Sequence, residues 1–378
     1  MTGLYIHVPF CRKVCDYCDF SVQSVPGRLY PEYVDLLLRE AELRLRGRRF
    51  YTFYLGGGTP SVLPAELLQR LFSGLARLGV RFGDMKELTM EMNPESASPD
   101  RLAVAMDSGI RRFSLGLQTL DDELLKMVGR SHSVKTGMAA LERLLSLVPR
   151  GIRVNADLMF DLPGQTLSGF VSDVRRIAGS GAGHISVYGL TVSPHTVLGT
   201  RVRKGELKIS EDLYPEMYRA CVSELEQAGF HRYEVSNFAK PGEESIHNQN
   251  YWDRGEYLGL GPGAHSFEGN VRSAGPSRYA EWRRWVGSGC PSGGFALDTL
   301  GKKERVTEIV WLSLRQAKGL DLDALFKTEG VSVPMNAVDC LCAKGWISAR
   351  GSHLCLAGDG WLMMDSVVNS LLPSDFRE

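Results

Sequence analysis

The sequence has no excess of charge of either sign. Lysine and arginine together number 44, aspartate and glutamate also number 44, and the formal net charge is therefore zero. A neutral chain has no overall field that would attract nucleic acid or an acidic membrane surface. We therefore expect small or locally charged ligands, and no nucleic acid among the partners.

Long hydrophobic runs are also missing. No apolar stretch approaches the roughly 20 residues that a membrane-spanning helix needs, so we expect no transmembrane segment. The chain does not open on the basic region, apolar run and small-residue cleavage site of a secretory signal. We therefore expect a cytoplasmic protein.

Cysteine is scarce, with eight residues in a chain of 378. A chain of this length buries a sufficient core without disulfides, and the cytoplasm keeps thiols reduced. Three of the eight nevertheless lie close together, as Cys11, Cys15 and Cys18 in CRKVCDYC. Such a group indicates a metal or catalytic site. The other five are scattered, and we expect most of them to be small buried residues.

Three thiolates are compatible with two kinds of site. A catalytic zinc keeps three protein ligands and one open position, and a structural zinc needs a fourth ligand, for which His7 is available. A 4Fe-4S cluster normally takes four thiolates, so three would leave one iron free for another ligand. The cysteine spacing by itself leaves both alternatives open.

Short apolar segments alternate with amphipathic ones over the first half of the chain. Six segments rich in Val, Ile, Tyr and Phe read as strands, at 4–10, 50–58, 87–94, 111–118, 152–160 and 184–190. Four segments with apolar residues at helical spacing lie between them, at 31–45, 64–78, 134–147 and 167–180. This α/β alternation predicts a parallel sheet curled into a full or partial (β/α)6 barrel of the TIM type, with a doubly wound open sheet as the alternative.

Unusual residues fall where the predicted strands end. They are the three cysteines, then Gly57, Gly58 and Thr59 in GGGTP, Glu91 in EMNP, Gln118, Asp157 and Thr191. The carboxyl ends of all strands in a parallel barrel open onto one face, so we expect these residues to form one site. Consecutive glycines allow close approach of the backbone to a ligand, and the two acceptor oxygens of Glu91 suit the paired hydroxyls of a ribose.

The order of these motifs resembles that of a known family. YIHVPFCRKVCDYC, LGGGTP, EMNP, GLQT, GRSH and DLMFDLPGQT follow one another within the first 200 residues. They are similar to the radical S-adenosylmethionine (SAM) superfamily, and within it to the group of oxygen-independent coproporphyrinogen III oxidases (dehydrogenases) and HemW heme chaperones. The resemblance implies a 4Fe-4S cluster on Cys11, Cys15 and Cys18 whose free iron binds SAM. It also implies a SAM pocket lined by Tyr5, Tyr17, Gly57, Gly58, Thr59, Glu91, Gln118, Arg130, Asp157 and Thr191.

Three features favour the heme-chaperone branch of this group. The dehydrogenases carry a further cysteine two residues after the third ligand, where this chain has Phe20, and they carry an extension before the first strand. HNQNYW at 247–252 resembles the H-N-x-x-Y-W signature of the chaperones. The resemblance implies binding of haem and its delivery to haem-dependent acceptor proteins. The alternatives are a coproporphyrinogen III dehydrogenase, which we do not expect, and a metal-binding scaffold without SAM chemistry; whether SAM is cleaved stays open.

A histidine beside two aromatic residues also has a direct interpretation. Imidazole is a common axial ligand of haem iron, and Tyr251 and Trp252 offer flat apolar surface, so His247 is the candidate haem ligand. The alternative is that HNQNYW caps a helix or closes the bottom of the barrel. Cys290, before a proline, is a second candidate ligand, although loop formation explains it equally well.

The last third of the chain has a different pattern. Three predicted helices at 302–316, 322–328 and 333–345 precede a hairpin at 346–360 that turns near Gly351 and Ser352, and a last helix follows at 361–372. Helices followed by a hairpin are typical of a winged-helix-like α+β domain, but no basic recognition helix indicates DNA binding. We therefore predict a core at 1–200, an extension at 201–300 that carries HNQNYW, and a C-terminal domain at 301–378.

Overall fold

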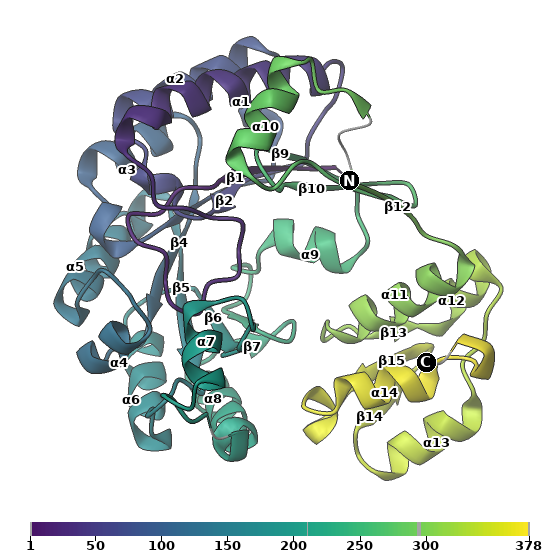
Figure 1. Cartoon of the computed structure of the whole chain (residues 1–378). Helices are drawn as coiled ribbons and strands as arrows, with labels where there is room; N and C mark the ends of the chain where they lie inside the picture. Colours follow the sequence, from purple (N-terminus) through teal and green to yellow (C-terminus); the bar gives the residue numbers. More distant parts are fainter. Residues whose placement is uncertain (1, 210, 293–295, 377–378) are drawn as a thin grey trace.

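A computed structural model describes residues 2–209, 211–292 and 296–376. Most of the strands form one curved sheet of 12 strands, and a second sheet of three strands belongs to a C-terminal domain (Figure 1). No helix of the described residues is long and apolar enough to cross a membrane.

The first half of the chain alternates strands and helices. The elements are β1 (Gly3–Val8), α1 (Tyr30–Arg44), β2 (Thr52–Gly57), α2 (Ala65–Arg77), β3 (Glu87–Met92), α3 (Pro99–Asp107), β4 (Arg112–Gln118), α4 (Asp122–Met127), α5 (Val134–Leu145), β5 (Arg153–Phe160), α6 (Leu167–Ala178) and β6 (His184–Gly189). All six predicted strands and all four predicted helices are confirmed. The short helices α3 and α4 were not recognised in the sequence.

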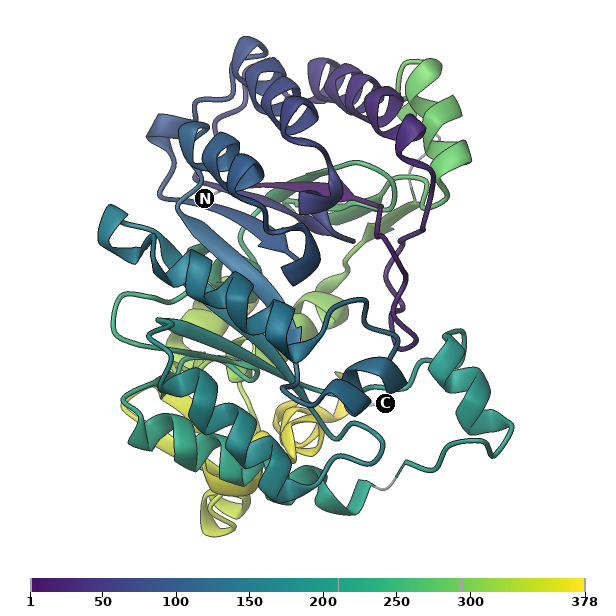
Figure 2. The ribbon, with the colours of Figure 1, turned by 90° about the vertical axis from the view of Figure 1, so that its left-hand side faces the viewer.

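The order of strands separates the two predicted topologies. Strands β1 to β6 lie side by side in the order in which they occur in the sequence, and each adjacent pair is parallel. A doubly wound sheet reverses its strand order at a switch point and so places helices on both faces. Here the order does not reverse, and helices α1 to α6 lie on the outer, convex face (Figures 1 and 2). The fold is therefore a partial barrel, and the sheet ends at β12 and β7.

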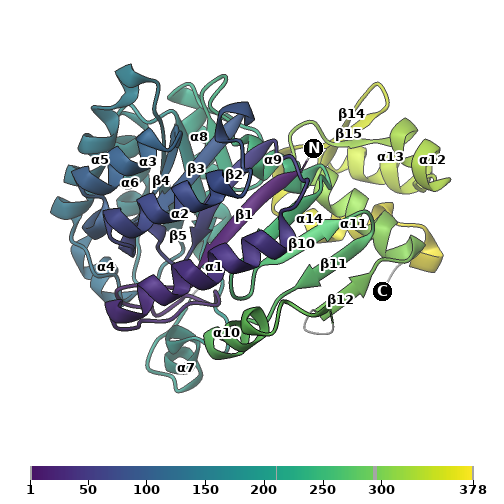
Figure 3. The ribbon, with the colours of Figure 1, turned by 90° about the horizontal axis from the view of Figure 1, so that it is seen from above.

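The middle of the chain extends both edges of this sheet. Its elements are α7 (Val197–Arg203), α8 (Tyr214–Gln227), β7 (His231–Arg232), β8 (Asn237–Ala239), α9 (Ile246–Trp252), β9 (Tyr257–Leu260), β10 (His265–Glu268), β11 (Val271–Ala274), α10 (Tyr279–Gly287) and β12 (Ala296–Thr299). Strand β8 pairs with β6, whereas β9 pairs with β1 and leads into an antiparallel β10, β11 and β12. Figure 3 shows this second edge beside α1 and α10.

Side chains of the core strands alternate between two environments. Leu4, Ile6 and Val8 of β1 are fully buried against the helices. The residues between them are polar, as are the inner residues of the other strands, including Glu87, Arg112 and Asn155. Because successive residues of a strand face opposite sides, the convex face forms the apolar core and the concave face is polar.

The C-terminal domain confirms its predicted elements. It contains α11 (Lys302–Leu314), β13 (Leu320–Asp321), α12 (Leu322–Glu329), α13 (Met335–Ala343), β14 (Ile347–Arg350), β15 (His353–Leu356) and α14 (Met364–Leu371). Strands β14 and β15 form the hairpin, which turns at Gly351 with φ of 61°. Glycine adopts this left-handed conformation without steric cost. Figure 1 shows α9 between the concave side of the sheet and this domain.

Helix α9 closes the end of the sheet at which the strands begin. The Glu87 carboxylate at the start of β3 accepts hydrogen bonds from the backbone N–H groups of Ile246 and His247, both at 3.0 Å, and from the Ser245 hydroxyl at 3.1 Å. Arg153 forms an ion pair with it at 3.2 Å. Burial alone would raise the pKa of Glu87. The positive charges of Arg112 and Arg153 and the hydrogen-bond donors have the larger combined effect, so the pKa lies below its usual value.

Replacement of this carboxylate should destabilise the fold. Glu87→Gln leaves the buried cation Arg112 without its main counter-charge, and removal of one partner from such a pair costs about 3 to 5 kcal/mol. We expect the free energy of unfolding, measured with urea, to fall by about 3 kcal/mol. Glu123→Gln, which removes a carboxylate of an exposed ion pair, is the control. Equal stability of the two variants would contradict the role of Glu87.

Candidate functional site

The three clustered cysteines lie in a loop that is closed by backbone hydrogen bonds. The N–H of Cys11 donates to the carbonyl of Gln23 at 3.0 Å, and the N–H of Gln23 donates to the carbonyl of Pro9 at 2.7 Å. At the far end, Asp16 donates to the Val128 carbonyl at 3.0 Å and accepts from the N–H of Leu198 at 2.7 Å. These bonds hold the loop across the carboxyl ends of the strands, beside α4 and α7 (Figure 2).

All three cysteines line one cavity of about 400 Å³ at this end of the sheet. Eight further residues that the sequence predicted for the SAM pocket line the same cavity: Tyr17, Gly57, Gly58, Glu91, Gln118, Arg130, Asp157 and Thr191. Within the described ranges, no three His, Cys, Asp or Glu side chains are close enough together to hold a single metal ion. The thiols instead surround a space of the size that holds a small ligand.

The glycines after β2 bring the backbone against the cysteine loop. A Cβ at Gly58 would lie 2.7 Å from the Phe10 carbonyl oxygen and 3.0 Å from the sulfur of Cys11, so a side chain does not fit there. Gly57 has φ of 109°, which favours glycine. Thr59 lies behind the cavity, where its hydroxyl donates to the sulfur of Cys11 at 3.5 Å.

Glu91 is the acidic group at the base of the cavity. Its carboxylate accepts hydrogen bonds from the Tyr54 hydroxyl at 2.7 Å and from the N–H of Gly57 at 3.0 Å. Burial raises the pKa of Glu91 to about 7, and the nearby Asp157 adds to the rise, while the Tyr54 hydrogen bond opposes it. Each carboxylate oxygen retains a lone pair that can accept a hydroxyl of a ligand.

Arg130 is the cation of the site. One of its terminal nitrogens lies 3.4 Å from the sulfur of Cys15, and the other donates to Asn93 Oδ1 at 2.9 Å and to the Gly116 carbonyl at 2.7 Å. Its Nε is buried and has no partner among the described residues. The guanidinium therefore offsets negative charge at Cys15 and keeps one unused donor.

Two residues of β4 and β5 complete the polar wall. Gln118 has φ of 72°, a left-handed conformation uncommon for a residue with a side chain, and it follows a bulge in the pairing of β4 with β5. Such strained positions are enriched at functional sites. The Asp157 carboxylate accepts from Asn155 at 2.7 Å and from Ser114 at 3.1 Å, and burial raises its pKa.

Several residues of the cavity were not recognised from the sequence. They are Lys13, Asp19, Tyr54, Met92, Ser114, Gly116, Met159, Tyr188, Gly189 and Leu190. Tyr54, Ser114 and Tyr188 belong to the polar inner positions of their strands, so the alternation of polar and apolar residues in those strands was the signal for them.

Three predicted site residues lie outside this cavity: Thr59, Tyr5 and His247. The Tyr5 hydroxyl lies 2.9 Å from His7 Nδ1, and its ring lines a neighbouring cavity. His247 is 1% exposed and lies at the opposite end of the strands, where its Nδ1 is 2.7 Å from the Thr52 hydroxyl and its Nε2 is 2.8 Å from the Tyr251 hydroxyl. Both ring nitrogens therefore have partners, and neither is free for a haem iron in this structure.

The expectation that most of the five scattered cysteines are buried is wrong, because Cys221 and Cys355 are buried, Cys290 is half-buried, and Cys340 and Cys342 are exposed. Cys290 follows α10 and does not line the cysteine cavity. Its N–H donates to the Trp285 carbonyl at 3.0 Å, and its φ of 55° is left-handed. Burial raises the pKa of its thiol to about 11. A left-handed residue with this hydrogen bond is typical of the end of a helix. Cys290 therefore fits the alternative in which it forms a loop.

Comparisons with known proteins identify the family of the chain. Residues 5–177 match the model of the Radical SAM superfamily. The Heme chaperone HemW of Bacillus subtilis (strain 168) is 33% identical over 383 residues, which cover 98% of this chain and 99% of that protein. The Heme chaperone HemW of Mycobacterium tuberculosis (strain CDC 1551 / Oshkosh) is 37% identical and covers 98% and 94%.

A solved structure supports the fold. Coproporphyrinogen III oxidase (HemN) from Escherichia coli, described as a radical SAM enzyme, superposes with a TM-score of 0.83 and 21% identity, covering 98% of this chain and 89% of that one. At that identity the match establishes the partial barrel and its C-terminal domain, and the identities near 35% over the full length establish the branch. The chain belongs to the HemW heme-chaperone family of the radical SAM superfamily.

Proposed function

We propose that this protein binds haem and passes it to haem-dependent acceptor proteins, and that it holds a 4Fe-4S cluster on Cys11, Cys15 and Cys18 with SAM in the adjoining cavity. The observation that carries the proposal is the convergence of three thiols and eight polar or glycine residues on one cavity, in a chain whose relatives are named heme chaperones. Tyr5, Thr59 and His247 do not line that cavity, so they would support the bound groups indirectly.

The residues present fit an iron-sulfur cluster. Burial raises the pKa of the Cys11 thiol to about 11, so thiolate formation needs a cationic partner such as iron, with release of the proton. Arg130 adds a positive charge at Cys15, and its buried Nε lacks a partner among the described residues. When bound, the cluster supplies the single electron with which radical SAM proteins cleave the carbon–sulfur bond of SAM.

The cavity also fits SAM. Gly57 and Gly58 leave its wall open to close approach, and the Glu91 carboxylate presents two oxygens to a pair of hydroxyls. Asp157 and Gln118 supply further polar contacts on the opposite strands. These groups bind and orient a ligand, and the loop that covers them limits access of water.

The dehydrogenase function is the second candidate, and Phe20 separates it from the first. The dehydrogenases carry a cysteine where this chain has Phe20, which is 67% exposed beside the cysteine cavity. The test is to reconstitute the full chain anaerobically, then titrate it with haem and supply coproporphyrinogen III with SAM and a reductant. We expect haem binding without porphyrinogen turnover. Formation of protoporphyrinogen would overturn the chaperone function.

Loss of one cysteine should remove the cluster. Cys15→Ala deletes one of three thiolates, and two thiolates do not retain a cube that normally takes four ligands. We expect the iron and sulfide content after anaerobic reconstitution to fall close to zero. Cys340→Ala, at an exposed thiol of α13, is the control and should retain full content. Full iron content in Cys15→Ala would refute the assignment.

Arg130 should adjust the reduction potential of the cluster. Its guanidinium stabilises the more negative, reduced state, so Arg130→Gln should make the potential more negative by about 60 mV, the shift of a tenfold change in a one-electron equilibrium. A redox titration followed by electron paramagnetic resonance measures this shift. Lys126→Gln, at an exposed lysine of α4 that pairs with Glu123, is the control. An unchanged potential in Arg130→Gln would contradict the role of the guanidinium.

SAM affinity should depend on pH through Glu91. Below its pKa of about 7 the group is a neutral acid, and above it the carboxylate accepts both ribose hydroxyls. We expect the affinity to rise between about pH 6 and pH 8, measured by calorimetry on the reconstituted protein. Glu91→Gln should bind more weakly and show a flatter profile. A flat profile in the unmodified protein would show that Glu91 does not bind in its ionised form.

A further inference from the structure

A second large cavity lies on the concave face, next to the cysteine site. It measures about 720 Å³ and lies between the inner face of β9, β10 and β11, the end of α9 and the start of the C-terminal domain at α11. Asp19 and Phe20 of the cysteine loop line both cavities. The second cavity thus extends from the loop to α11.

The floor of this cavity is a ladder of side chains on one face of the antiparallel strands. His265 and Phe267 are two residues apart on β10 and face the same side. Across the strands, Ala274 pairs with His265, Arg272 pairs with Phe267, and Tyr257 pairs with Phe267 from the other side. The small Ala274 leaves open space directly beside the imidazole of His265.

Aromatic rings form the adjoining wall. The rings of Tyr251 and Tyr257 meet edge to face at a centroid distance of 4.6 Å, and Tyr257 lies 6.4 Å from Phe267. Trp252 and Tyr5 also line the cavity. Flat aromatic walls suit a flat and largely apolar ligand.

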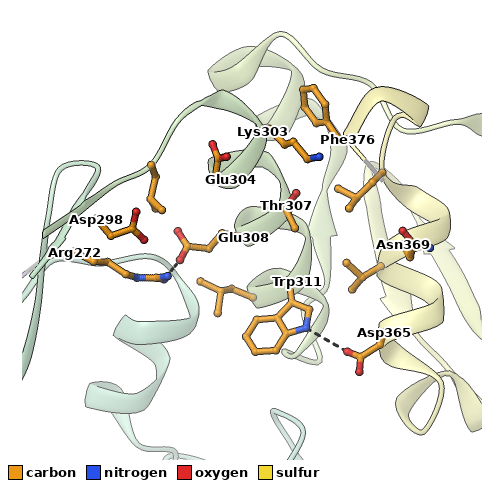
Figure 4. Close-up of a pocket in the computed structure, with 14 residues that line it drawn as sticks. Arg272, Asp298, Lys303, Glu304, Thr307, Glu308, Trp311, Asp365, Asn369 and Phe376 are labelled. Atoms are coloured by element: carbon orange, nitrogen blue, oxygen red, sulfur yellow. Dashed lines mark hydrogen bonds and ion pairs between the residues drawn. The ribbon is translucent and has the colours of Figure 1, made fainter. Parts of the chain in front are cut away.

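The end of the cavity near α11 carries two arginines. Arg254 and Arg272 both pair with the carboxylate of Glu308, and Asp298 of β12 is the cross-strand partner of Arg272. Figure 4 shows the pairing of Arg272 with Glu308 at the border of another cavity. Arg254 has a left-handed φ of 51°, and its Nη2 is buried without a hydrogen-bond partner among the residues described. A carboxylate of a ligand would satisfy this donor.

The two histidines of the cavity differ in their availability. Both nitrogens of His7 have partners, the Tyr5 hydroxyl and the Ser21 carbonyl, each at 2.9 Å. His265 is exposed, and its ring has no hydrogen-bond partner in the described part of the chain. It lines the same cavity as the aromatic wall and the two arginines.

We propose that this cavity is the haem site, with His265 as the axial ligand of the iron and Arg254 and Arg272 as the partners of the propionates. The inference rests on the proposed function and gives it a location. A flat macrocycle with iron at its centre and carboxylates at one edge needs an apolar slot, an imidazole and cations at one end, and the cavity has all three. His247 is a positioning residue, because its Nε2 bonds to the hydroxyl of Tyr251 and thereby fixes a ring of the wall.

The test is titration of the reconstituted, full-length protein with ferric haem, followed by difference absorbance at the Soret band. His265→Gly should weaken binding about tenfold or more and lose the spectrum of an imidazole-ligated iron. Added imidazole should restore that spectrum, which a merely structural role of His265 would not predict. Metal-free protoporphyrin IX, which needs no axial ligand, should bind His265→Gly and the unmodified protein equally.

Three further variants make the result decisive. Ala274→Phe fills the space beside His265 and should weaken both haem and metal-free protoporphyrin. His247→Gln keeps a polar partner for Tyr251 and should retain the imidazole-ligated spectrum. His195→Gly, at an exposed histidine outside the cavity, is the matched control. If His265→Gly does not fold, as judged by circular dichroism, Ala274→Phe alone decides.

The possible failures are distinguishable. If the unmodified protein binds no haem, the proposed function fails. If it binds haem, and His265→Gly and Ala274→Phe keep its affinity and spectrum, the function stands and this site is refuted. If His247→Gln loses the spectrum of an imidazole-ligated iron and His265→Gly keeps it, His247 is the axial ligand and His265 is not.

Discussion

The parallel pairing of β1 to β6 is the constraint on which the site depends. Each strand runs in the same direction, so the residues that follow the strands meet at one rim although they are far apart in the chain. The cysteine loop after β1 closes over that rim, because its ends are tied by Cys11 and Gln23 and its tip is tied by Asp16. A shift of one residue in register would turn Glu91 and Asp157 from the cavity into the core.

The concave face shows what keeps the cavity polar. Inner positions carry a network in which His184 Nδ1 lies 2.6 Å from Asn155 Oδ1, and Asn155 in turn donates to Ser114 and Asp157. Barrels that bury apolar side chains inside have no room for a ligand, whereas this network supports ionisable groups at the rim. The same burial raises the pKa values of Glu91 and Asp157 and makes their protonation sensitive to what binds beside them.

Most of the fold and the cysteine site could be predicted, because both follow from local patterns. Strand ends locate Gly57, Glu91 and Asp157 without knowledge of tertiary structure, and parallel topology then brings them together. The position of His247 could not be predicted in this way. Its motif shows that the histidine is near aromatic residues but not which end of the sheet the helix closes, and that depends on Glu87, 160 residues away along the chain.

The two cavities are joined by the residues that the cysteine loop contributes to both. Phe20 lies in the loop whose backbone hydrogen bonds run through Cys11, Gln23 and Asp16, and its carbonyl accepts from the N–H of Val22 at 2.7 Å. Ligation of Cys18 by a cluster would fix the backbone two residues before Phe20, and so fix one wall of the second cavity. If both proposals hold, a cluster on the cysteines would order a wall that the proposed haem cavity shares with the cysteine cavity.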